Sequence, residues 1–98
     1  MHFVVNHLPI RADADWAEMA RRFGDFAAGL RGSRPGVTSA LLLRAGEEEA
    51  IVVVGYADLA TLKDVSSNVA APWFAENIRP YLSGPAARSV GEMLAGFA

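Results

Sequence analysis

A polar pair interrupts the first apolar run of the chain. Asn6 and His7 lie within residues 3–10, an otherwise apolar stretch typical of a β-strand. An asparagine amide can orient a substrate oxygen or an oxyanion, and an imidazole can transfer protons near neutral pH. Adjacent strand residues point to opposite faces, so the two side chains cannot form one site. We predict a pocket amide at Asn6, with a hydrogen bond to a neighbouring helix or loop as the alternative, and an interface role for His7.

Aromatic residues at four further positions are candidates for lining a pocket. Tyr56 ends the third apolar run, either as a core ring with its hydroxyl at the rim or as a pocket donor. Trp73 and Phe74 begin a short helical segment, where they serve either core packing or a pocket wall. Tyr81 follows the helix-breaking Pro80, a position from which it would close a pocket mouth.

Other kinds of chemistry find little support in the residue types. His2 and His7 have opposite parity on one strand, so they cannot chelate one metal ion. Cysteine is absent, and so are phosphate-loop, dinucleotide-binding, zinc-protease and serine-hydrolase motifs. We expect no metal and no cofactor, and we expect Arg79 and Arg88 to be solvated.

The positions of these residues depend on a regular series of elements. Asp13 and Asp15 are both helix N-cap candidates, and apolar residues follow them at helical spacing. Ser66, Ser67 and Asn68 are expected to break the helical region that follows Asp58, and Pro72 to begin the next helix. The pattern predicts strands over 2–10, 37–44, 50–56 and 87–96, helices over 15–31, 59–66 and 72–78, and a hairpin loop over 45–48.

This order, β-α-β-β-α-β, predicts an α+β, ferredoxin-like fold with an antiparallel four-stranded sheet and helices on one face. The third strand is apolar on both faces, which indicates that both faces are covered. One helix layer covers one face, and we expect a second subunit on the other.

Composition limits the function classes. The 98 residues are expected to form one domain, 1–98, with 52% hydrophobic and 20% charged residues. The net charge of −2, without a basic run, argues against a nucleic-acid partner. No apolar run approaches the roughly 20 residues of a membrane span, and no signal peptide is recognisable. The absence of cysteine is compatible with the cytoplasm, where we expect the protein.

These features together resemble the antibiotic biosynthesis monooxygenase superfamily of small dimeric α/β-barrel proteins. The resemblance covers nearly the whole chain. It depends on the order and spacing of Asn-x-Leu-Pro-Ile at 6–10, Arg22-Phe23, Pro35-Gly36, an aromatic helix, and Leu-Ser-Gly-Pro at 82–85. It implies a homodimeric α/β barrel whose sheets meet face to face, with His7 on the meeting face and Asn6 in a pocket under the helices.

The resemblance also implies alternative activities. The haem-degrading branch carries an asparagine that matches Asn6, but its tryptophan and histidine fall at Val65 and Ile78 here. Haem degradation is therefore disfavoured. The polyketide-oxygenating branch carries a tryptophan where this chain has Tyr56 and a tyrosine where it has Leu62.

Two hypotheses about function follow. The first is a cofactor-independent monooxygenase for an aromatic or quinone-like substrate, in which Asn6 and Tyr56 act on the substrate. Phe23, Trp73, Phe74 and Tyr81 would bind it. The second is a non-catalytic dimeric domain that binds a small apolar ligand.

Overall fold

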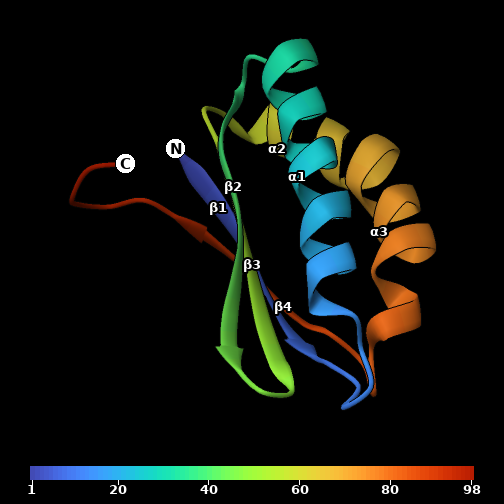
Figure 1. Ribbon diagram of the computed structural model, residues 1–98. Helices are drawn as coiled ribbons and strands as arrows, with labels where there is room; N and C mark the ends of the chain where they lie inside the picture. Colours follow the sequence, from blue (N-terminus) through green and yellow to red (C-terminus); the bar gives the residue numbers. More distant parts are fainter.

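The computed structural model describes all 98 residues and confirms the ferredoxin-like arrangement (Figure 1). Four antiparallel strands form one sheet in the order β2-β3-β1-β4, and all helices lie on one of its faces. The elements are β1 His2–Pro9, α1 Trp16–Ser33, β2 Val37–Gly46, β3 Glu49–Tyr56, α2 Leu59–Val65, the π-turn η1 Ser66–Ala70, α3 Ala71–Asn77, the 3₁₀ turn η2 Arg79–Tyr81 and β4 Ala87–Glu92.

The register of the central strand β1 decides which side chains share a face. Asn6 lies opposite Val52 of β3 and opposite Arg88 of β4. Val4 lies opposite Val54 in the same way. Because directly opposed residues of antiparallel strands point to the same side, all five belong to the helix-covered face.

Helix α1 begins one residue after the predicted start and ends two residues beyond the predicted end. The Asp15 carboxylate accepts a hydrogen bond from the Glu18 backbone N–H at 3.0 Å, which caps the helix. The Glu18 carboxylate accepts hydrogen bonds from the guanidinium groups of Arg21 and Arg22, which lower its pKa to about 2. The inner face buries Met19, Phe23 and Leu30 against the sheet. This amphipathic face fixes the helix layer.

The expected break at 66–68 is wrong. Instead the π-turn joins α2 to α3, so that the backbone stays helical from Leu59 to Asn77. The Ala71 N–H reaches the Ser66 carbonyl, a wider turn than the α-helix makes. Pro72 then falls in the first turn of α3, where its missing N–H is tolerated. A change of helical register, and not a chain break, accommodates the proline.

Strand β4 is shorter than the predicted 87–96, because its pairing with β1 ends at Glu92. His2 pairs with Glu92, and the Met93 N–H donates to the Met1 carbonyl at the very start of the chain. The pairing of β4 with β1 therefore stops at Glu92. Leu94 and Phe97 consequently lie outside the sheet, 88% and 99% exposed, in the segment that leaves it in Figure 1.

The two faces of the sheet differ in cover. A core of 13 buried side chains fills the space between the sheet and the helices. No helix covers the opposite face, where Leu41 and Leu43 of β2 remain 50% and 44% exposed. Val5 and Val53 stand beside them, half-buried, on the same uncovered face. No helix is long and apolar enough to traverse a bilayer.

Candidate functional site

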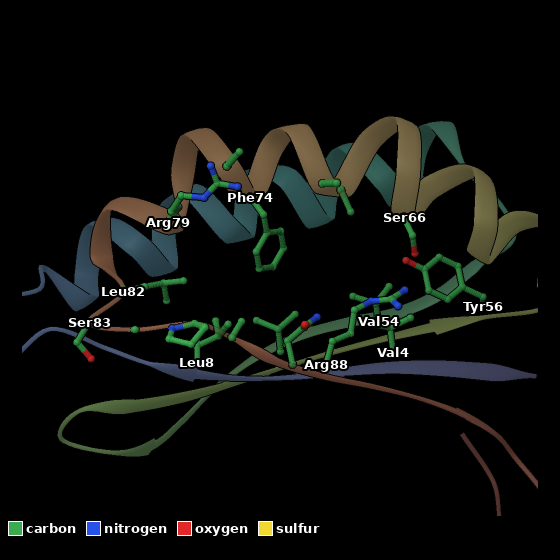
Figure 2. Close-up of a pocket in the computed structure, with 18 residues that line it drawn as sticks. Val4, Leu8, Val54, Tyr56, Ser66, Phe74, Arg79, Leu82, Ser83 and Arg88 are labelled. Atoms are coloured by element: carbon green, nitrogen blue, oxygen red, sulfur yellow. The ribbon is translucent and has the colours of Figure 1, made fainter.

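A cavity of about 670 Å³ lies between the sheet and the helical segment α2-η1-α3 (Figure 2). Its size suits a ligand of a few fused rings, since small-molecule pockets are typically roughly 300–1,000 Å³. Eleven of its 18 lining residues are hydrophobic. The lining comprises Val4, Asn6, Leu8, Val52, Val54, Tyr56, Ser66, Ala70, Ala71, Phe74, Ala75, Arg79, Leu82, Ser83, Gly84, Pro85, Ala86 and Arg88.

Asn6 is placed on the floor of this cavity by β1. It is half-buried and stands between the buried Val4 and Leu8 along the strand. Its side-chain amide makes no hydrogen bond with the rest of the protein. The alternative prediction, a hydrogen bond from Asn6 to a neighbouring helix or loop, is therefore wrong. A donor and an acceptor are therefore free toward the cavity.

Tyr56 lies at the end of β3 on the same floor. Its side chain is buried, and in Figure 2 its hydroxyl and that of Ser66 point toward each other. Burial raises the pKa of the phenol, while the Ser66 hydroxyl and the positive charge of Arg88 act in the opposite direction. The net shift is upward, so Tyr56 is a neutral hydrogen-bond donor at physiological pH.

The helical wall combines one large ring with several small side chains. Phe74 points from α3 toward the sheet, as Figure 2 shows. Ala70, Ala71 and Ala75 surround it on the same wall. Alanines leave the volume that larger residues would fill, and the phenyl ring offers a face against which a flat apolar molecule can pack.

Two arginines complete the lining, and both are exposed, as predicted. Arg88 extends from β4 toward Tyr56, and Arg79 begins η2, just after α3 (Figure 2). Both remain solvent-accessible, and neither forms an ion pair. The lining contains no carboxylate, histidine, lysine or cysteine. The register that pairs Arg88 with Asn6 places both side chains on the same face of the sheet. The sequence alone does not give this register.

Three of the predicted binding residues lie outside the cavity lining. Trp73 stacks on Phe26 of α1, with ring centroids 4.2 Å apart, and its edge meets Phe23 at 6.2 Å. This cluster joins α1 to α3 outside the cavity. Tyr81 faces α1 as well, where the Arg22 guanidinium lies 5.9 Å from its ring centroid.

The two histidines lie on opposite faces of β1. His7 is exposed on the uncovered face, with Nδ1 3.7 Å from a Glu49 carboxylate oxygen. His2 approaches Glu92 with 3.6 Å between Nε2 and Oε2. No group of three or more histidine, cysteine, aspartate or glutamate side chains is arranged to hold a metal ion.

The fold and the cavity together define a class: ferredoxin-like domains with a mainly apolar pocket between sheet and helices. A scan of protein-family models gives no match, and no curated protein matches. Solved structures do match. A provisionally assigned antibiotic biosynthesis monooxygenase from Caulobacter crescentus has a TM-score of 0.79 at 24% identity, covering 96% of this chain and 90% of that one.

Two further likenesses concern proteins of stated activity. SnoaB, a cofactor-independent oxygenase from Streptomyces nogalater, has a TM-score of 0.75 at 14% identity, over 97% of this chain and 94% of its own. MhuD, a haem degrader from Mycobacterium tuberculosis, has a TM-score of 0.72 at 20% identity, over 100% of both chains. The likeness to these structures confirms the predicted ferredoxin-like fold.

Proposed function

We propose that this protein is a cofactor-independent monooxygenase acting on an aromatic or quinone-like substrate in the cavity. The observation that carries the proposal is that the partnerless Asn6 amide and the neutral Tyr56 phenol both line the floor of a mainly apolar cavity. Preorganised donors of this kind stabilise negative charge that develops on a substrate oxygen. The likeness to SnoaB supports the same chemistry.

The proposed reaction converts an activated methylene to a ketone: R₂CH₂ + O₂ gives R₂C=O + H₂O. The substrate loses a proton to give an enolate, whose carbon transfers one electron to O₂. The radical pair combines to a peroxide, which takes up a proton and loses water. The substrate supplies all four electrons, so no external reductant is needed. Asn6 and Tyr56 would donate hydrogen bonds to oxygens of the substrate while Phe74 packs against the rings.

The residues fit haem chemistry poorly, despite the likeness to MhuD. The cavity lining contains no histidine to serve as an axial ligand. Ile78 and Val65, which occupy the positions that the resemblance assigns to the haem ligand and the tryptophan, are fully buried in the core. The proposed reaction therefore does not involve haem. A titration with haem that leaves the Soret band unshifted is the expected result.

A second candidate is a non-catalytic domain that binds a small apolar ligand. Leu62 and Val65 favour it, because they fill the core at positions where the resemblance implies reactive residues. The two functions separate in one experiment. A binding protein would bind hydroquinones or anthrones without consuming oxygen. An oxygenase would consume oxygen when both the substrate and the protein with an unmodified cavity are present.

The proposal includes a homodimer through the uncovered face of the sheet. Exposed leucines on that face are the argument, since exposed apolar surface is costly unless covered. The cavity lies on the other face, so each subunit would hold a complete site of its own.

Oxygen uptake with a panel of anthrones and hydroquinones tests the activity. We expect Asn6→Ala to lower kcat/KM by about 100-fold, the usual effect of removing one oxyanion donor. Asn68→Ala is the matched control, because Asn68 is exposed on the helical segment and its amide donates to Asp64 outside the cavity. Equal turnover by the Asn6→Ala variant and the unmodified protein would contradict the proposed role.

A further inference from the structure

The cavity offers cations and neutral donors but no base. None of its 18 lining residues is a carboxylate, a histidine or a lysine, and the pKa of its one phenol is raised. A substrate that had to lose a proton inside this cavity would find no side chain to accept it at neutral pH. The substrate must therefore arrive already ionised, or the proton must leave through water.

Arg88 supplies what an ionised substrate needs. It lies directly opposite Asn6 in the register of β4 and β1, on the same face of the sheet. Its side chain extends along the floor toward Tyr56, so three donors from three neighbouring strands line one stretch of the cavity (Figure 2). Hydrogen bonds from a guanidinium to an oxyanion are about twice as strong as those between neutral groups.

The charge of Arg88 is not neutralised by the protein. No carboxylate lies within ion-pair distance of it, whereas Arg11, Arg21, Arg22 and Arg34 each pair with an acidic side chain. The chain as a whole carries a net charge of −2, so a cavity with two arginines and no acid is locally opposite in sign to the molecule. Such a site attracts an anion.

We propose that Arg88 makes the cavity selective for flat aromatic molecules that enter as phenolates or enolates, and that it binds their oxyanion together with Asn6. This inference rests on the proposed function only in taking the cavity as the substrate site. It adds the protonation state in which the substrate binds and names a specificity-determining residue on β4.

A matched pair of probes isolates the charge. 2-Hydroxyanthraquinone ionises in mild alkali, and 2-methoxyanthraquinone has the same ring system without an acidic proton. We expect the protein to bind the phenolate about tenfold more tightly than the methyl ether in calorimetric titrations at low salt, a typical effect of one charge-assisted hydrogen bond. The preference should fade when the pH is lowered until the phenol is neutral, while binding of the ether stays constant.

Three variants assign the effect. Arg88→Gln should bind both probes equally, and Arg88→Lys should keep part of the preference because it keeps the charge. Arg31→Gln is the control for net charge, because Arg31 is exposed on α1 outside the cavity and makes no ion pair. It should bind like the unmodified protein. Arg88 lies on an exposed edge strand, so its replacement should leave the thermal midpoint unchanged.

The outcomes that overturn the inference are distinct from those that overturn the oxygenase. Equal binding of both probes by the unmodified protein, binding of neither, or a preference that survives Arg88→Gln would refute it. A phenolate preference that depends on Arg88, without oxygen uptake for any substrate, would refute the oxygenase and leave this inference standing.

Discussion

At the scale of single residues, the site depends on polar groups that the fold does not use for its own stability. Asn6 has no hydrogen-bond partner and Arg88 has no counter-ion. Polar groups on an apolar floor lower stability unless they are solvated or bound, and both of these retain access to solvent. Occupation of the cavity by a suitable ligand should therefore stabilise the protein.

Tyr56 predicts how stability depends on alkaline pH. Burial raises the pKa of its phenol in the folded state above the value of about 10 in the unfolded chain. Above about pH 10 the unfolded state thus loses its proton first, so stability falls as the pH rises toward the folded pKa. Tyr56→Phe should remove this fall, which urea melts at about pH 8 and about pH 11 would detect. The same alkaline loss in both proteins would contradict the prediction.

The sequence predicts a residue of the site where alternation along a single strand decides which face of the sheet the residue occupies. Asn6 was identified because alternation along one strand decides its face. Arg88 was missed because its importance depends on pairing between the two ends of the chain, which no local pattern encodes. Trp73 and Phe74 illustrate the same limit. They are adjacent in the sequence, and the rotation of α3 decides that Phe74 and not Trp73 faces the cavity.

At the scale of elements, Gly36 controls how closely α2 approaches the start of β2. A Cβ atom at this position would lie 2.5 Å from Thr61 Oγ1 and 2.7 Å from its Cγ2. Both distances are far below van der Waals contact. Gly36 also accepts a hydrogen bond from the Ala57 N–H at 2.7 Å, so the backbone cannot retreat freely. The turn between helix α1 and strand β2 thus sets the position of the helical wall.

Gly36→Ala should therefore destabilise the protein by about 1–3 kcal/mol, the usual effect of overpacking. Denaturant melts measure the change, and adding Thr61→Ala should recover part of it. Gly24→Ala is the matched control: it lies within α1, its Cβ would meet nothing within 4 Å, and it should stabilise by about 0.5–1 kcal/mol. A Gly36→Ala variant as stable as the unmodified protein would show that α2 shifts without cost.

The elements themselves were largely predictable. Helix α1 has an N-cap at Asp15 and an apolar face at regular spacing, both local features. The sequence predicts a break after Asp58 at Ser66, Ser67 and Asn68, with Pro72 beginning the next helix. The structure keeps the helical segment continuous by widening one turn. The end of β4 was missed because it depends on where β1 begins.

At the scale of the whole molecule, one face of the sheet carries the helices and the site, and the other carries exposed leucines. The proposed homodimer covers this second face. Strands with one solvated face normally alternate apolar and polar residues. Strands β2 and β3 lack this alternation, which indicates that the second face of the sheet is covered.

Light scattering should give twice the mass of the chain, and Leu41→Lys should shift it toward the monomer, because a buried ammonium without a partner is costly. Leu59→Lys is the matched control: Leu59 is 43% exposed, similar to Leu41 at 50%, but it belongs to α2 in the helix layer. A monomeric mass for the unmodified protein would rule out the dimer. Dissociation by Leu59→Lys to the same extent would assign the interface elsewhere.

The π-turn has a consequence for how the length of this chain can vary in evolution. It holds one residue more than an α-helix of the same rise needs. Loss of one residue within 66–70 would restore a regular helix and leave Phe74 directed at the sheet. Loss of one residue from α2 would instead turn α3 by about 100° and carry Phe74 away. Insertions and deletions in relatives that keep the cavity should therefore concentrate in these five positions.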